Sequence, residues 1–134
     1  MNHWLVKTEP GTYSWDDLVR DKRTAWTGVR NFLARNMMRQ MKEGDAAFVY
    51  HSGAEKAIKG IAKIVREAYS DEASNGGSWS VVDIAAVRPL ARDVTLDEIK
   101  GAAELENMVL VKNSRLSVQP VTEGEWEAIL ALGS

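Results

Sequence analysis

Hydrophobic and polar positions along the chain predict six short strands. Each run is apolar-centred or alternates between apolar and polar residues, and Pro10, Pro89 and Pro120 follow or close three of them. Several runs follow one another with no helical pattern between them, which favours antiparallel or mixed pairing over repeated βαβ units. The six predicted strands are His3–Thr8, Ala46–His51, Lys59–Glu67, Trp79–Val87, Met108–Lys112 and Leu116–Gln119.

Helices are predicted where a capping residue precedes an apolar pattern of helical period. Thr95 with Glu98 and Thr122 with Glu125 form capping boxes, and Ser14 caps a short helix through Arg20. Another helix is predicted over Asn31–Met41. It places Phe32, Leu33, Met37, Met38 and Met41 among Arg35, Arg39 and Lys42. Strands in series with helices at the ends predict an α+β fold built on a small closed or nearly closed β-barrel.

The whole chain, residues 1–134, is expected to form a single domain. Its length, 45% hydrophobic residues and 27% charged residues are those of an ordinary globular protein. We find no internal repeat, and the segment Ser70–Ser78 has the Gly, Asn and Ser content of an exposed loop, too short to be a domain linker.

Targeting and redox signals are absent from the sequence. No apolar run approaches the ~20 residues that cross a bilayer, so we expect no membrane partner. The start of the chain, Met1–Trp4, lacks the basic and apolar regions of a secretory signal. With no cysteine the chain has no disulfide framework. We therefore expect a cytoplasmic protein.

Positive charge is concentrated in one segment of an otherwise acidic chain. The net charge is −2, yet Arg20–Lys42 holds seven basic residues against the single acid Asp21. Within this segment Trp26–Asn31 joins a large aromatic, a glycine and an arginine. Such a combination stacks a nucleobase and holds its phosphates. The alternative is a solvated helix face beside a core tryptophan.

Catalytic signatures are weak, and we expect no enzyme. The histidines His3 and His51, with no cysteine, are too few for a usual zinc site, so no metal and no cofactor are expected. His51 and Ser52 resemble a nucleophile pair, but adjacent strand residues point to opposite faces. Neither glycine-rich phosphate motif occurs.

A binding pocket is better supported, because four polar segments fall where predicted strands and helices end. Alternatives remain for several residues: Trp4, Trp15, Trp79 and Trp126 as core, Tyr50 and His51 as a satisfied half-buried pair, and Arg115 as a surface arginine. The candidate residues are Lys7, Thr8 and Glu9, then Trp26, Thr27, Arg30 and Asn31, then Tyr50, His51 and Ser52, and finally Lys112, Ser114 and Arg115.

The same segments carry a family resemblance that runs over nearly the whole chain. The motifs W-L-V-K-T-E-P, Y-S-W-D-D-L, W-T-G-V-R-N-F-L-A-R-N, Y-H-S and S-R-L-S-V-Q-P-V closely resemble the EVE domain, found in bacterial proteins and in the thymocyte nuclear protein type. The resemblance implies a PUA-like fold related to YTH readers of methylated adenine. It also implies a pocket for a modified nucleobase in DNA or RNA. The segment Ser70–Ser78 is shorter than expected for the family. If this loop forms one wall of the pocket, its length affects which ligand the pocket accepts.

These observations predict a non-enzymatic reader that takes one extruded, modified base into a pocket. By analogy with the YTH arrangement, Trp26 forms the stacking wall. A carboxylate such as Glu9 accepts from the exocyclic amine of cytosine, which points to a modified cytosine. Two alternatives stay open: an enzyme acting on modified nucleotides or RNA, and a small-molecule or protein-interaction module. The expected contacts are Thr8, Glu9, Asn31 and Ser52 to base edges, and Lys7, Arg30, Lys112 and Arg115 to phosphate or sugar.

Overall fold

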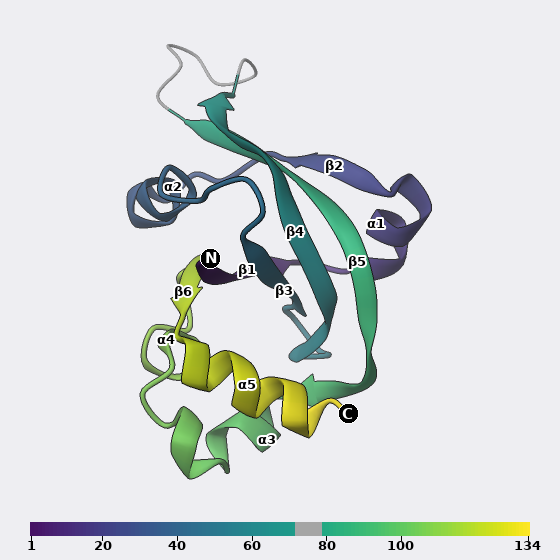
Figure 1. The fold of residues 1–134 in the computed structure, drawn as a ribbon, viewed down its shortest axis with the longest axis vertical. Coiled ribbons are helices and arrows are strands. Elements are labelled where there is room, and N and C mark those ends of the chain that lie inside the picture. Colours follow the sequence, from purple (N-terminus) through teal and green to yellow (C-terminus); the bar gives the residue numbers. More distant parts are fainter. Residues whose placement is uncertain (72–78) are drawn as a thin grey trace.

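The computed structural model describes residues 1–71 and 79–134 (Figure 1). The predicted loop Ser70–Ser78 therefore lies almost wholly outside the described residues. The strands are β1 (His3–Thr8), β2 (Arg23–Trp26), β3 (Ala46–His51), β4 (Ala57–Ser70), β5 (Ser80–Thr95) and β6 (Val118–Val121). The helices are α1 (Trp15–Asp21), α2 (Phe32–Met38), α3 (Leu96–Lys100), α4 (Val109–Lys112) and α5 (Glu123–Leu132), with a 3-10 turn, η2 (Ala103–Leu105).

The strands form one six-stranded mixed sheet in the order β2-β5-β4-β3-β1-β6. β1 pairs with β3 in parallel, and the other neighbouring strands of the described sheet pair antiparallel. The predicted α+β class, six strands and mixed pairing are therefore confirmed.

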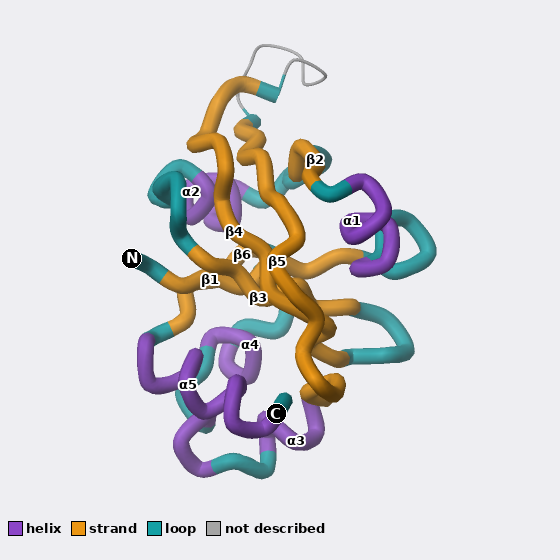
Figure 2. The backbone as a smooth tube through the Cα atoms, turned by 45° about the vertical axis from the view of Figure 1, so that its right-hand side comes forward, coloured by secondary structure: helices purple, strands orange, loops and turns teal. Residues whose placement is uncertain are grey.

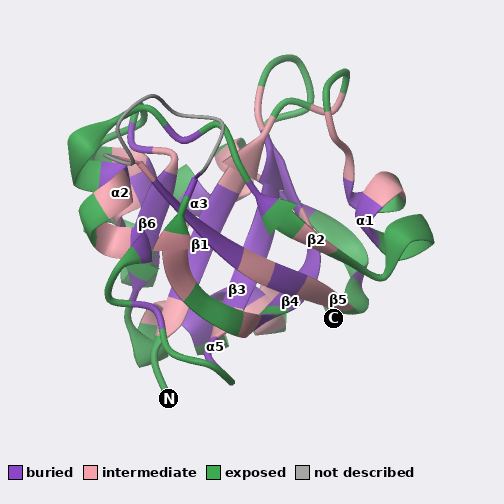
Figure 3. Cartoon of the chain, turned by 90° about the horizontal axis from the view of Figure 1, so that it is seen from above, coloured by how far each residue is buried: buried purple, intermediate pink, exposed green. Residues whose placement is uncertain are grey.

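Alternation along the central strands divides the interior into two hydrophobic cores, one on each face of the sheet. In β1, Trp4 and Val6 belong to the first core, whereas Leu5 belongs to the second. Helices α1 and α2 cover the first face, and α3, α4 and α5 cover the second (Figures 1 and 2). Viewed from above, the central strands β1 and β3 are mostly buried, whereas much of β2 and large parts of α1 and α2 are exposed (Figure 3).

The predicted caps are confirmed. The side chains of Ser14, Thr95 and Thr122 each accept a hydrogen bond from the backbone amide three residues on. In turn, the side chains of Asp17, Glu98 and Glu125 accept from the backbone amides of these capping residues. Each reciprocal pair satisfies amide groups that a helix start leaves without partners. Asn31 caps α2 in the same way, but without the reciprocal acid.

One predicted element is wrong, and one predicted helix, present as α2, exposes part of its apolar pattern. Met108–Lys112 is not a strand: Val109–Lys112 forms the helical turn α4, whose Leu110 is buried in the second core. A short apolar run has no period long enough to separate strand from helix, and packing decides. Phe32 and Leu33 do not face inward, being 62% and 45% exposed.

Strand β2 was not predicted, and β5 continues past its predicted end. Arg23–Trp26 is a four-residue edge strand with a mostly exposed pattern. Pro89 lies within β5, opposite Gly60 of β4. β2 pairs only with the residues Val82–Ala85, so β5 has a single neighbour at Pro89, and a proline is tolerated there.

The sheet does not close into the expected barrel. β2 and β6, four residues each, are its two edges, and no ladder joins them among the described residues. Instead, α2 packs against both β5 and β6 and bridges part of the opening. The rest of the opening holds the candidate site.

Candidate functional site

A pocket of about 450 Å³ opens between the sheet edges β2 and β6, at the carboxyl end of β1. Its volume is within the range of ligand sites. Its described lining is Lys7, Thr8, Glu9, Thr12, Tyr13, Thr24, Ala25, Trp26, Thr27, Gly28, Val29, Arg30 and Ser117.

The end of β1 supplies one wall through a tight turn. The backbone amides of Thr12 and Tyr13 both donate to the carbonyl of Glu9 at 2.9 Å. The Thr8 hydroxyl donates to the Tyr13 carbonyl at 2.5 Å. These bonds fold the chain back on itself, so that Tyr13 lies beside the strand residues Thr8 and Glu9.

Lys7 connects this wall to the segment before β6. Its ammonium donates to the carbonyl of Ser114, and its Nζ lies 5.7 Å from the centre of the Tyr50 ring. Burial lowers the pKa of Lys7 below its ordinary value, because the charged form loses hydration. The lysine is thus held in place, with its charge partly removed from water.

Glu9 places an exposed carboxylate at the pocket. The Ser52 hydroxyl donates to Glu9 Oε2 at 3.4 Å. Gly53 adopts φ +77°, and a Cβ there would lie 3.0 Å from both Glu9 carboxylate oxygens. A side chain at residue 53 would therefore push this carboxylate out of position.

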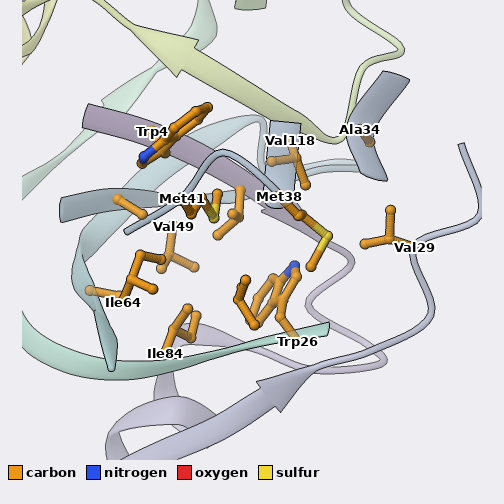
Figure 4. Close-up of a cluster of buried hydrophobic side chains, with 14 of the residues drawn as sticks. Trp4, Trp26, Val29, Ala34, Met38, Met41, Val49, Ile64, Ile84 and Val118 are labelled. Carbon is orange, nitrogen blue, oxygen red and sulfur yellow. The ribbon is translucent and has the colours of Figure 1, made fainter. Parts of the chain in front are cut away.

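Trp26 belongs to both the first core and the pocket. It is 8% exposed, and it packs in the same cluster as Met38 and Ile84 (Figure 4). Its ring meets that of Tyr13 edge to face, with centroids 6.2 Å apart and planes at 86°. The aromatic wall of the pocket is therefore formed by Tyr13 together with the edge of a core tryptophan.

After Trp26 the chain turns through Gly28, at φ +82°, and reaches Arg30 and Asn31. Arg30 Nη1 donates to the Val29 carbonyl at 2.9 Å and to the buried Asp71 carboxylate at 3.2 Å. The Asn31 side chain accepts from the Ala34 amide at 2.9 Å, so it is engaged as the cap of α2.

The structure gathers six of the thirteen predicted site residues around the pocket and places the others elsewhere. Tyr50 is buried in the second core, where burial raises its pKa. His51 is buried, and its Nε2 accepts from the Trp15 amide at 2.9 Å, which caps α1. The residues on the pocket are Lys7, Thr8, Glu9, Trp26, Thr27 and Arg30, and those off it are Asn31, Tyr50, His51, Ser52, Lys112, Ser114 and Arg115.

Sequence reasoning missed part of the pocket lining, and two of the missed residues lie on unpredicted structure. Thr24 and Ala25 lie on β2, which the pattern did not reveal. Tyr13 lies in the motif Y-S-W-D-D-L, whose aromatic residue was the available signal. Its hydroxyl donates to Asp21 Oδ2 at 2.9 Å, which fixes the ring at the pocket.

Carboxylates within and outside the basic segment Arg20–Lys42 partly neutralise its charge. Arg23 pairs with Asp83 at 3.3 Å and Arg30 with Asp71 at 3.2 Å. Arg20 pairs with Asp21 at 3.0 Å. The positive field near the pocket is weaker than the residue count suggests.

Residues 2–132 match the family model described as the EVE domain. The chain belongs to the EVE domain family. This EVE domain is similar to human thymocyte nuclear protein 1, with 37% identity over 165 residues that cover 98% of this chain and 73% of the human protein. That alignment is longer than the 134-residue chain, so the human protein carries inserted residues that this EVE domain lacks.

Solved structures show the same fold. A Rhodopseudomonas palustris protein solved by NMR is 48% identical, with a TM-score of 0.94 over 99% of this EVE domain and 93% of that chain. A second structure is that of the human THYN1 protein in complex with DNA containing 5-methylcytosine. It is 37% identical, with a TM-score of 0.91 over 100% of this chain and 98% of that chain.

The described residues of this EVE domain show neither a membrane-spanning helix nor a metal-binding cluster. No helix among them has the length and apolarity to cross a bilayer. They also hold no group of three or more His, Cys, Asp or Glu residues arranged to take a metal ion. The expected location in the cell remains a prediction.

Proposed function

We propose that this EVE domain is a non-enzymatic reader that binds a modified base in DNA, extruded from its stack. The observation that carries the proposal is the pocket at the open seam of the sheet. Its mouth combines an aromatic wall, a carboxylate and two cations. Ligand sites of this kind are concave and mostly apolar, with few polar groups that set orientation.

Each group has a distinct role in this proposal. Tyr13 and the edge of Trp26 contact the face of the base. Glu9 accepts from an exocyclic amine, and Thr27 and Ser117 contact other polar edges. Lys7 and Arg30 hold the sugar-phosphate on either side, and the Arg30 side chain is 43% exposed although it donates to Asp71.

A modified cytosine is the base that we favour. A carboxylate suits the exocyclic amine of cytosine, as it does in groove recognition. The human THYN1 structure with methylated DNA supports the same base and favours DNA over RNA as the partner.

The positions of both histidines support a binding role over an enzymatic one. His51 Nε2 is engaged by the Trp15 amide, and the His3 ring lies 4.5 Å from that of Trp126, on the side of the second core. Neither histidine lines the pocket. The described lining therefore lacks histidine, the side chain that most often acts as a general base.

The experiment is a titration of single-stranded oligonucleotides that differ in one central base, at one fixed salt concentration. Cytosine, methylcytosine, hydroxymethylcytosine, adenine and methyladenine are compared by fluorescence anisotropy. One buried methyl contributes about 0.8 kcal/mol, so we expect methylcytosine to be preferred about fourfold. Equal affinity for all five bases would refute the proposal.

The Glu9→Ala variant tests the pocket itself. Glu9 is exposed, so its loss should leave the fold intact and weaken cytosine-derived bases more than adenine-derived ones. The matched control is Glu104→Ala, another exposed glutamate, which lies on η2, away from the pocket. If both variants bind like the wild type, Glu9 does not read the base.

A further inference from the structure

Outside the pocket, two aromatic side chains from distant parts of the chain stack on each other at the surface. Phe32 begins α2, and Trp79 precedes β5. Their ring centroids are 4.9 Å apart, and their planes are inclined by only 24°. Phe32 is nevertheless 62% exposed, and Trp79 is half-buried.

Arginines border this stack without covering it. The Arg35 guanidinium carbon lies 4.9 Å from the Phe32 centroid and 5.8 Å from the Trp79 centroid. With the rings themselves 4.9 Å apart, these three distances form a nearly equilateral triangle, which places Arg35 beside the stack. Trp79 covers one face of Phe32, and the large exposure of Phe32 leaves its outer face open to solvent.

The stack adjoins the pocket through Arg30. This arginine lines the pocket, and its guanidinium carbon also lies 5.6 Å from the Trp79 ring centre. A strand whose base enters the pocket and whose phosphate contacts Arg30 therefore reaches the stack with its next nucleotide.

We propose that Phe32 and Trp79, together with Arg35, form a second subsite that stacks an unpaired base adjacent to the one in the pocket. This inference rests on the proposed function. Aromatic faces bind bases with little regard to sequence, and a nearby guanidinium supplies cation–π and phosphate contacts. The bordering arginines favour an anionic strand over an apolar protein surface.

The first test measures binding of Phe32→Ala and Trp79→Ala to single strands with cytosine or methylcytosine. Loss of one stacking contact should weaken both strands by about 5- to 100-fold and leave the ratio between them unchanged. Phe32→Tyr should retain binding, whereas Phe32→Leu, which keeps apolar bulk, should not. Val87→Ala, at a 52% exposed residue of β5, is the control.

The second test replaces the neighbouring nucleotide with an abasic one. For the wild-type protein, the abasic replacement should lower affinity about as much as the Phe32→Ala substitution does with the intact strand. For the Phe32→Ala variant, the abasic replacement should lower affinity little further. A 2-aminopurine placed next to methylcytosine should also be quenched on binding to the wild-type protein, which needs no variant to fold.

The outcomes separate the two proposals. If no strand binds with preference for the modified base, the proposed function fails. If methylcytosine is preferred and Glu9→Ala weakens it, but Phe32 and Trp79 variants bind normally, only the second subsite is overturned. It is equally overturned if Phe32→Ala weakens abasic and intact strands by the same factor.

Discussion

Trp26 occupies the boundary between the interior and the candidate site. Its burial places most of the indole in the first core, while its remaining edge belongs to the pocket wall beside Tyr13. The two interpretations offered by the sequence, a stacking wall and a core residue, therefore describe different parts of one side chain. In the proposed function, a base at this wall contacts the half-buried Tyr13 ring more than the indole face.

We expect Trp26→Ala to lower the free energy of unfolding by about 3–5 kcal/mol, because it leaves a cavity in the first core. Trp26→Phe should cost less, since it retains an aromatic ring. Urea denaturation of both variants measures these differences. If Trp26→Ala abolished binding while unfolding like the wild type, Trp26 would be a pocket residue alone.

At the scale of elements, Asp45 joins β1 to the turn that begins β3. Its buried carboxylate accepts from the Trp4 indole at 3.0 Å, the Lys42 amide at 2.9 Å and the Asn2 amide at 3.1 Å. Burial on its own would raise the pKa of the Asp45 carboxyl, but these donors outweigh it and hold the pKa below its ordinary value. The parallel pair β1–β3 thus depends on an ionised group.

We expect the stability that Asp45 contributes to be present above about pH 4 and to be lost as the pH falls through its depressed folded-state pKa. The reason is that the unfolded carboxyl takes up a proton first. Asp45→Asn should lower stability near neutral pH by about 1–3 kcal/mol, because an amide cannot satisfy all three donors. In thermal melts, the gap between variant and wild type should narrow below about pH 4. A gap that is constant with pH would show that the carboxylate charge is not what stabilises this turn.

Strong local signals allowed elements to be predicted from sequence. β1 and β3 match their predicted ranges, since each is a central strand with apolar side chains on both faces. The caps of α1, α3 and α5 also match, because a capping box acts through residues three apart. β2 and α4 are short, and only their packing against β5 and β6 decides their conformation.

At the scale of the whole molecule, one part of the candidate site was predicted from the sequence and another part was not. The end of β1 was found from sequence because polar residues follow a strong strand signal. The Trp26–Arg30 segment was found because an aromatic, a glycine and an arginine precede a predicted helix. Lys112 and Arg115 were placed near the pocket on the expectation of a strand at Met108–Lys112, but the chain forms α4 there. The stack of Phe32 on Trp79 joins residues 47 positions apart, and no local pattern reveals it.

An open sheet whose seam holds the pocket constrains how nucleic acid binds. A volume of about 450 Å³ at the open seam suits one base and its sugar, and the proposed function takes that base singly. A base must therefore leave its duplex stack before it enters. That extrusion costs a few kcal/mol in a paired duplex and less where the base is mismatched.

We expect affinity to rise from a fully paired duplex, to a duplex mismatched at methylcytosine, to a single strand. The cost of extruding the base alone sets this order. The ratio of affinities for methylcytosine and cytosine should therefore be similar in all three forms of DNA. Because Lys7, Arg30 and Arg35 are the cations beside the pocket and the stack, the slope of log K against log salt for single strands should be about −2, at ~0.7 for each phosphate contact. Anisotropy titrations at several salt concentrations measure both quantities. A slope of about −4 or steeper would mean that the wider basic segment Arg20–Lys42 binds the backbone. Equal affinity for paired and mismatched duplexes would mean that no base is extruded.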